Sequence, residues 1–325
     1  MKAAYIEQPG PPQHIRYGDL PMPEMGKRDV QVKVTAVEVN SVDTYIRSGA
    51  YKTRLPQPFI IGRDMTGVVS EVGAKVTQFR PGERVWTNNQ GYDGRQGTFA
   101  EYCSIDEARL YHLPGNVDPY EAVSVLHSAL TAVLGLFFRA KMQAGETIFI
   151  NGGDGNVGIA VLQLAKAIGG RVIVTSGNEQ KASWCREQGA DLVINYKTQD
   201  VQQAIKDFAP QGVNVYWDAT RKPDAAKAME VVAHRGRIVF MAGLSHQTTL
   251  PVGPFYTHNC SLYGFTVTDA TTEELAEYAE RINHWLAQGV LKGNIAKRLP
   301  LSQAARAHQM YESESLFGKL VLAPD

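Results

Sequence analysis

The chain has 325 residues, more than one ordinary hydrophobic core needs, so its length predicts two domains. Lys and Arg together number 33, as do Asp and Glu, and this zero net charge argues against a nucleic-acid or anionic-membrane partner. The three cysteines are far apart and lack C-x-x-C spacing, and the first residues carry no apolar signal segment. Both features favour a cytoplasmic protein with reduced thiols.

The first part of the chain, up to about residue 121, is typical of short strands separated by Gly and Pro. Residues 30–39 alternate apolar and polar side chains, residues 67–72 form a second run, and residues 81–86 read as a turn leading into a strand. We predict an irregular β-barrel here.

An apolar stretch follows at residues 122–138. Ser124, His127, Ser128 and Thr131 interrupt it, and it is short for a bilayer span. It therefore predicts a buried helix that joins two domains, and no membrane span.

The pattern changes at Gly145, after which apolar runs alternate with helical segments. The runs occupy residues 147–150, 171–175, 191–195, 213–217, 237–241 and 262–267, and the helical segments 157–168 and 179–188 each stop at glycine. This alternation predicts an α/β fold with a parallel, doubly wound sheet. A helical pattern at residues 272–288 and a strand-like run at 319–322 then return the chain to the first domain. We expect a first domain of residues 1–122 and 268–325 around a nucleotide-binding domain of residues 123–267.

The sharpest local motif lies at residues 152–158, where Gly-Gly-Asp-Gly-Asn-Val-Gly contains G-x-G-x-x-G between a predicted strand and a predicted helix. Glycines allow a tight turn and close approach to a pyrophosphate, which then meets the free amides of the helix N-terminus. This context favours a dinucleotide site over a simple turn. Asp154 is unusual there, because its carboxylate repels a diphosphate unless it points away or caps the helix.

The end of the second predicted strand bears on cofactor choice. An NAD site places an acid there, but the sequence has Thr175-Ser176-Gly177-Asn178, with Lys181 just inside the next helix. Lys181 is either a solvated surface lysine or a partner for a 2'-phosphate, and we predict NADPH as the preferred cofactor.

Further segments carry a family resemblance. The most specific is residues 39–49, Val-Asn-Ser-Val-Asp-Thr-Tyr-Ile-Arg-Ser-Gly, followed by Tyr51; others are Gly62-Arg63-Asp64 before Gly67, residues 81–85, and residues 97–102. The chain resembles the medium-chain dehydrogenase/reductase superfamily over nearly its whole length, and within it the quinone oxidoreductases that include zeta-crystallin. The resemblance implies a GroES-like β-barrel catalytic domain plus a Rossmann domain, in a homo-oligomer such as a dimer or tetramer.

The resemblance also implies cofactor residues. Thr131 lies in the helix on the nicotinamide side, and Gly177, Lys181 and Tyr196 fall where the 2'-phosphate is held. Without the resemblance, Tyr196 and Phe265 are equally well explained as ordinary core aromatics. The phosphate loop and two later segments complete the set: Asp154, Gly155, Asn156, Val157 and Gly158; Ala242, Gly243, Leu244 and Ser245; Phe265, Thr266 and Val267.

The zinc ligands of related alcohol dehydrogenases are not matched. Asn40 stands at the cysteine position, Gly62-Arg63-Asp64 replaces Gly-His-Glu, and no four-cysteine lobe lies between Gln90 and His112. Dispersed histidines are more often structural than metal ligands. We expect no metal.

Without zinc, the easiest hydride acceptors are quinones and enones, in which charge spreads onto oxygen. Tyr45, followed by Tyr51 and Asn40, are the candidate catalytic donors to that oxygen. Asp43 and Arg47 are equally well explained as a structural pair. Two alternatives remain open: an enoyl-thioester (2-enoyl-CoA or ACP) reductase, and a non-catalytic, crystallin-like NADPH-binding protein.

Overall fold

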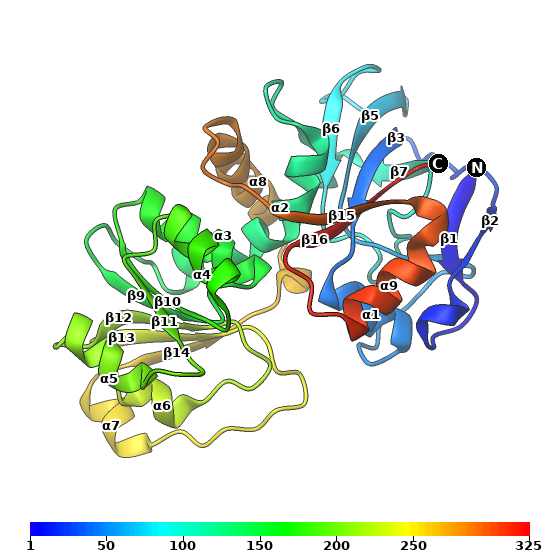
Figure 1. Cartoon of the computed structure of the whole chain (residues 1–325). Helices are drawn as coiled ribbons and strands as arrows, with labels where there is room; N and C mark the ends of the chain where they lie inside the picture. Colours follow the sequence, from blue (N-terminus) through cyan, green and yellow to red (C-terminus); the bar gives the residue numbers. More distant parts are fainter. The chain divides into compact units, whose positions relative to one another are not determined.

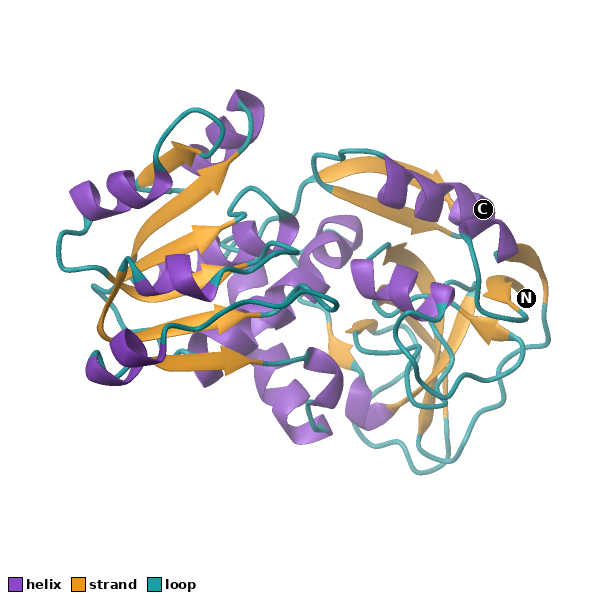
Figure 2. Ribbon diagram, turned by 90° about the horizontal axis from the view of Figure 1, so that it is seen from below, coloured by secondary structure: helices purple, strands orange, loops and turns teal.

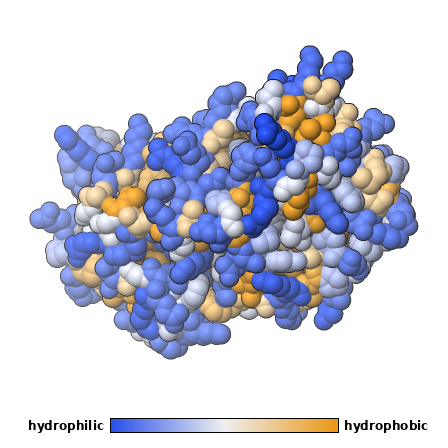
Figure 3. Space-filling model, turned by 90° about the horizontal axis from the view of Figure 1, so that it is seen from above, coloured by the Kyte–Doolittle hydropathy of each residue, from blue (hydrophilic) through white to orange (hydrophobic).

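The computed structural model describes residues 1–325, which form two compact units (Figure 1). One unit is discontinuous and comprises Met1–His127 and Thr268–Asp325, and the other comprises Ser128–Val267. Figure 3 shows one face of the molecule, on which hydrophobic side chains form small separate patches among hydrophilic ones.

The continuous unit is built on a six-stranded parallel sheet with the strand order β11-β10-β9-β12-β13-β14. This is the order of a doubly wound nucleotide-binding sheet, which confirms the predicted sheet type. Figure 2 shows the strands with helices packed around them. The strands are β9 (Thr147–Asn151), β10 (Arg171–Ser176), β11 (Leu192–Asn195), β12 (Val213–Asp218), β13 (Val232–Phe240) and β14 (Ser261–Gly264); the helices are α3 (Asn156–Ala167), α4 (Glu179–Glu187), α5 (Val201–Phe208), α6 (Ala225–Met229) and α7 (Val252–Thr257).

The last strand of this sheet is shorter than predicted. β14 pairs with β13 from Ser261 to Gly264. Gly264 lies opposite Phe240, the last residue of β13. Beyond that point the chain has no neighbouring strand, and Val267–Asp269 forms a 3-10 turn. The predicted strand at residues 262–267 is therefore wrong over its last three residues.

The discontinuous unit contains a seven-stranded sheet and a three-stranded sheet. The large sheet has the order β15-β16-β3-β5-β6-β8, with β7 also paired to β3, and the small one has the order β2-β1-β4. The strands are β1 (Lys2–Ile6), β2 (Arg16–Asp19), β3 (Asp29–Glu38), β4 (Phe59–Ile60), β5 (Met65–Val72), β6 (Arg84–Thr87), β7 (Tyr102–Asp106), β8 (Tyr111–His112), β15 (Ile295–Pro300) and β16 (Lys319–Ala323); the helices are α1 (Ser41–Ser48), α8 (Thr272–Ala287) and α9 (Ala304–Ser313).

Each unit has its own apolar core. Alternating residues of β3 such as Val30, Val32 and Val34 pack with Ala304 and Met310 of α9 in the discontinuous unit. In the other unit Phe149, Ile173 and Ile194, from three adjacent strands, form the corresponding core.

Helix α2 (Pro119–Val133) continues as a π-helical turn, Leu134–Arg139. This stretch is apolar and long enough to pass a composition test for a membrane span, but 78% of its most apolar window is buried inside the protein. It is a core helix, as its interrupting polar residues predict.

Candidate functional site

The glycine loop connects β9 to α3, and three of its glycines are required by the protein itself. Gly152 has a φ of 76°. A Cβ on Gly153 would lie 2.4 Å from Cβ of Val174, and one on Gly158 would lie 2.4 Å from the carbonyl oxygen of Gly152. The loop therefore folds tightly against the end of β10 only because these side chains are missing.

Gly155 is different. Its φ of −85° suits any residue, and an added Cβ would come no closer than 3.4 Å to the protein. It is exposed and is the N-cap of α3, whose first amides have no partner within the helix. Space for a close approach at a helix N-terminus is what a pyrophosphate needs, so the loop fits a dinucleotide.

The side chain of Asp154 points toward the end of β10. One of its carboxylate oxygens accepts hydrogen bonds from Ser176 Oγ at 2.9 Å and from the backbone N–H of Gly177 at 3.1 Å. The carboxylate thus caps the strand end and occupies a backbone donor beside the expected 2'-phosphate position.

Two of the three residues predicted to hold the 2'-phosphate, Gly177 and Tyr196, lie next to each other. A Cβ on Gly177 would meet the Tyr196 hydroxyl at 2.6 Å, so this phenol lies directly over Gly177. Tyr196 is 54% exposed, which is unusual for a core aromatic. Lys181 is the third residue of α4, where its N–H donates to Oδ1 of the N-cap Asn178, and no carboxylate forms an ion pair with its ammonium group.

The other predicted cofactor segments lie after β13 and β14. Gly243 has a φ of 94°, and an added Cβ would lie 2.9 Å from Pro223, while the neighbouring Leu244 is 64% exposed. The Phe265 ring lies 6.1 Å from that of Trp217, Val267 and Thr131 are buried, and Thr266 is exposed. Nothing yet tests the role of these residues, and their assignment stays a prediction.

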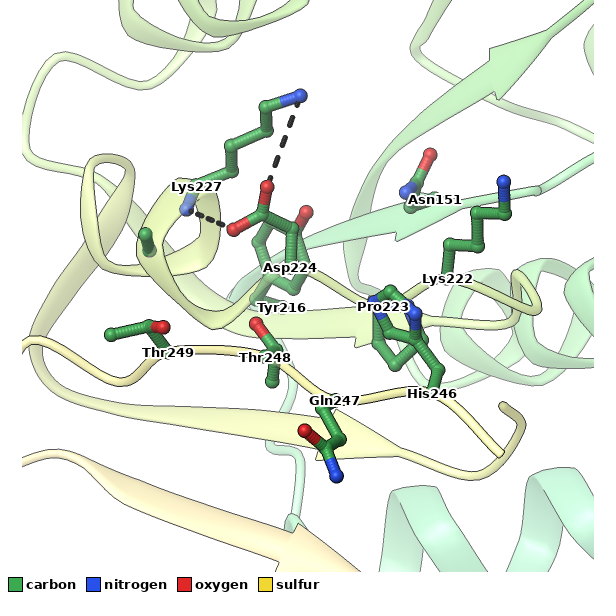
Figure 4. A pocket seen from close by; sticks show the side chains of 11 residues that line it. Asn151, Tyr216, Lys222, Pro223, Asp224, Lys227, His246, Gln247, Thr248 and Thr249 are labelled. Atoms are coloured by element: carbon green, nitrogen blue, oxygen red, sulfur yellow. Dashed lines mark hydrogen bonds and ion pairs between the residues drawn. The ribbon is translucent and has the colours of Figure 1, made fainter. Parts of the chain in front are cut away.

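A polar pocket of about 650 Å³ lies in the same unit, next to the chain segments that follow β12 and β13 (Figure 4). Asp224 and Lys227, three residues apart at the start of α6, lie next to each other in its lining, with 3.9 Å between Nζ and Oδ2. None of the predicted cofactor residues lines it.

Asn40, predicted to be catalytic, is the centre of a buried polar cluster in the discontinuous unit. Its amide nitrogen donates to Asp64 Oδ2 at 2.8 Å, its amide oxygen accepts from Lys319 Nζ, and its backbone N–H donates to Asp43 Oδ2 at 2.7 Å. Both ends of the Asn40 side chain are thus engaged by the protein.

Lys319 also forms a buried ion pair with Glu38, at 2.7 Å between Nζ and Oε2. Burial, the largest single effect, would lower the pKa of Lys319, but Glu38, Tyr311 and Asp64 together outweigh it and the pKa is raised. His127 contributes its ring, with Nδ1 3.5 Å from Asp64 Oδ2. Sequence reasoning missed Glu38 and Lys319, because nothing in their local sequence marks them as partners.

Asp43 and Arg47 do not form the structural pair that was one of the two interpretations of these residues. It is residue N3 of α1 and turns back to cap the helix at Asn40, whereas Arg47 donates to the carbonyl oxygen of Gly10 and to Glu312. Burial, reinforced by the nearby charge of Asp64, raises the pKa of Asp43 to about 8.

The two candidate tyrosines differ in their surroundings. Tyr45 is half-buried on α1, and no hydrogen bond involves its hydroxyl. Tyr51 lies beside Tyr92, with 6.0 Å between ring centroids, and burial together with Tyr51 raises the pKa of Tyr92. The Tyr92 ring in turn lies 5.9 Å from the guanidinium carbon of Arg63. Tyr51, Tyr92 and Arg63 therefore share one environment.

Two family models match the chain. Residues 26–115 match the alcohol dehydrogenase GroES-like domain, and residues 156–284 match the domain described as zinc-binding dehydrogenase. Together they account for more than half of the sequence, and they confirm the GroES-like and Rossmann-like domains.

Full-length relatives are also similar. The quinone oxidoreductase of Pseudomonas aeruginosa is 30% identical over 323 residues, covering 97% of each protein. The human quinone oxidoreductase is 28% identical over 327 residues, covering 99% of this chain and 97% of that protein. The crystal structure of the Escherichia coli quinone oxidoreductase complexed with NADPH has a TM-score of 0.86 and 26% identity, and covers 100% of both chains.

Proposed function

Because the chain belongs to the quinone oxidoreductase-like family of the medium-chain dehydrogenase/reductase superfamily, we propose that it reduces quinones or other conjugated carbonyls with NADPH. The observation that carries this proposal is the loop around Gly155. Gly155 leaves open space at the N-terminus of α3, although neither its backbone conformation nor its protein neighbours require a glycine. When bound, the reduced nicotinamide supplies a hydride.

The preference for NADPH is supported by the end of β10. Gly177 and Tyr196 lie next to each other there, Lys181 follows in α4 without an ion-pair partner, and no acid ends β10 to bind a ribose 2'-hydroxyl. The Asp154 carboxylate lies at this strand end, and it already accepts two hydrogen bonds from the protein.

The reaction is proposed to need no zinc. The positions that resemble zinc ligands are Asn40 and Arg63, an amide and a cation, and no group of three or more His, Cys, Asp or Glu side chains is arranged to hold a metal. Metal analysis of the purified protein should find no stoichiometric zinc, and one tightly bound ion per chain would contradict this.

In this reaction Tyr45 remains the first tyrosine candidate to hydrogen-bond the acceptor, since its hydroxyl has no protein partner. Asn40 acts as a positioning residue, because its side chain already links Asp64 to Lys319. Tyr45→Phe should lower kcat by about a hundredfold or less and leave NADPH binding nearly unchanged. Unchanged turnover in Tyr45→Phe would shift the role to Tyr51.

The substrate class is tested by NADPH consumption with a panel of quinones and enones and with a panel of enoyl-CoA thioesters. We expect turnover with the first panel. Preference for the thioesters would make the chain an enoyl-thioester reductase, and binding of NADPH without turnover of either panel would favour a crystallin-like binding protein.

We further propose a cytoplasmic homo-oligomer. β14 is an edge strand with Leu262 39% exposed, and α7 beside it exposes Val252 and Tyr256, each by 67%. An open strand edge with apolar side chains favours pairing with a second copy. Light scattering should give a dimer or larger for the native protein and a monomer for Leu262→Lys.

A further inference from the structure

Arg63 follows β4 and is one of the largest fully buried side chains of the protein, with 1% exposure. Its guanidinium nitrogens Nε, Nη1 and Nη2 are all inaccessible, and none has a hydrogen-bond acceptor in the protein. Its hydrogen bonding is limited to the backbone, where the N–H of Gln90 donates to the Arg63 carbonyl oxygen at 3.1 Å. Five N–H donors of a permanent cation are therefore left unused.

Arg47 shows how this protein normally treats a buried arginine. It is equally buried, at 1% exposure, but Nη1 donates to the carbonyl oxygen of Gly10 at 2.8 Å and Nη2 pairs with Glu312. Arg47 thus joins α1 to two distant segments of the unit. The Arg63 side chain forms no hydrogen bond that would join two segments.

The two carboxylates near Arg63 form no hydrogen bond with its guanidinium. Asp64 and Asp43 attract the guanidinium through space, but neither forms an ion pair with it. Asp64 Oδ2 accepts from Asn40 Nδ2, and Asp43 Oδ2 accepts from the Asn40 backbone N–H. The other oxygen of each carboxylate, Oδ1, is buried without a hydrogen bond, so neither acid satisfies a donor of Arg63.

The surroundings of Arg63 add positive charge. Arg95 is half-buried, and burial together with the charges of Arg109 and Arg63 lowers its pKa to about 10. A buried cation without a partner destabilises a folded protein, and a buried polar group without a hydrogen bond calls for an explanation such as a catalytic role. Arg63 is poised for an anionic or strongly polarised oxygen.

We propose that Arg63 is a catalytic residue that binds the carbonyl oxygen of the acceptor and stabilises the oxyanion formed there. This rests on the proposed function. The Tyr92 ring lies next to Arg63, and the Tyr51 ring lies next to that of Tyr92. Aromatic side chains of this kind pack well against a quinone ring. Arg63 stands at the position where the related zinc enzymes carry a histidine ligand, so a guanidinium takes over the role of the metal as electrophile.

The step balances without a further reagent. A hydride forms a new C–H bond at a carbon conjugated to the carbonyl, the π electrons move onto the oxygen bound by Arg63, and the nicotinamide is oxidised. The oxyanion then takes one proton from solvent. Arg63 keeps its own protons, because a guanidinium does not titrate in the working range.

The first test measures binding of a phenolate and does not need turnover. 4-Nitrophenol, titrated into the full chain with NADP⁺ present, changes its visible absorption on ionisation. Arg63 should raise the ratio of bound phenolate to bound phenol by about tenfold over that in solution. Arg63→Met should lose this shift, and Arg47→Met, the matched buried arginine, should keep it.

The second test separates catalysis from structure. Arg63→Met should lower kcat for a neutral quinone by about a hundredfold, leave the Kd of NADPH unchanged, and melt at or above the native temperature, because it removes an unpaired buried charge. Arg47→Met should melt lower. Arg63→Ala should regain activity when free guanidinium is added at non-denaturing concentration, and Arg63→Lys should be intermediate.

The proposal is overturned if Arg63→Met keeps the phenolate shift, or if it melts as low as Arg47→Met and guanidinium rescues nothing in Arg63→Ala. If the native protein reduces no quinone or enone, the proposed function fails. A phenolate shift that depends on Arg63 would in that case still establish the oxygen-binding site.

Discussion

The glycine loop and the buried cluster around Asn40 are stabilised in opposite ways. The loop is one short segment, residues 152–158, in which missing side chains let the backbone turn and leave the first amides of α3 free. The cluster uses side chains brought from distant positions, including Glu38, Asp64 and Lys319, and satisfies them mainly with one another.

The contrast teaches where each region is vulnerable. The loop is destabilised when a side chain replaces a glycine hydrogen, because the neighbouring atoms belong to backbone and β-branched side chains that cannot move away. The cluster is destabilised when one charged side chain is removed, because the opposite charge then stays buried without a counter-ion. Four substitutions sharpen this contrast.

The largest effect is expected from breaking the Glu38–Lys319 pair. Lys319→Met leaves Glu38 buried without its cation and should lower the free energy of unfolding by about 3–5 kcal/mol. Chemical denaturation measures this loss. Glu38→Gln combined with Lys319→Met should recover much of it, and a double variant as unstable as the single one would contradict the pairing.

Asp43 should make stability depend on pH. Its pKa is raised to about 8 in the folded protein, so the folded chain keeps a proton that the unfolded chain releases above its ordinary value of 3.8. Unfolding is therefore favoured as the pH rises from about 4 to 8, by up to about 1 kcal/mol per pH unit.

Asp43→Asn should flatten this part of the stability curve, and the exposed Asp93→Asn should keep the native slope. Thermal melts across that pH range provide the comparison. A native-like slope in Asp43→Asn would show that another group carries it.

Adding one methyl group tests the loop. In Gly158→Ala the new Cβ would lie 2.4 Å from the Gly152 carbonyl oxygen, which should destabilise the domain by about 1–3 kcal/mol and greatly weaken NADPH binding. Gly155→Ala is the matched control for folding, since its Cβ has room. It should keep the native melting temperature and lose only cofactor affinity, as calorimetry would reveal.

Asp154 gives the smallest expected effect. Asp154→Ser removes a carboxylate from the Gly177 N–H and should strengthen NADPH binding by about tenfold, or 1.4 kcal/mol, with less change for NADH. Asp200→Asn, which alters the cap of α5, serves as the control. Weaker NADPH binding in Asp154→Ser would mean that the carboxylate orders the strand end for the phosphate.

The contrast also explains what the sequence could predict. The parallel sheet and its glycine loop follow from patterns within short windows, as does the capping box of α8, where Thr271 and Glu274 cap each other. β15 was missed, because its segment Ile295–Pro300 mixes charged and apolar residues and forms only by pairing with β16.

The cluster was visible only in part. Asn40 and Arg63 stand out through resemblance, but the residues clustered with Asn40 come from the ends of β3 and β16 and from α2, which only the fold brings together. The lack of a hydrogen-bond partner for Arg63 could not be predicted either, because a sequence does not reveal which acceptors surround a side chain in the folded protein.

Calorimetric titration of the folded native chain with NADPH and with NADH tests the central claim most directly. We expect saturable binding of NADPH that is tighter than that of NADH, and a strong loss of NADPH binding in Gly158→Ala. Absence of binding heat for both nucleotides in correctly folded protein would contradict the account.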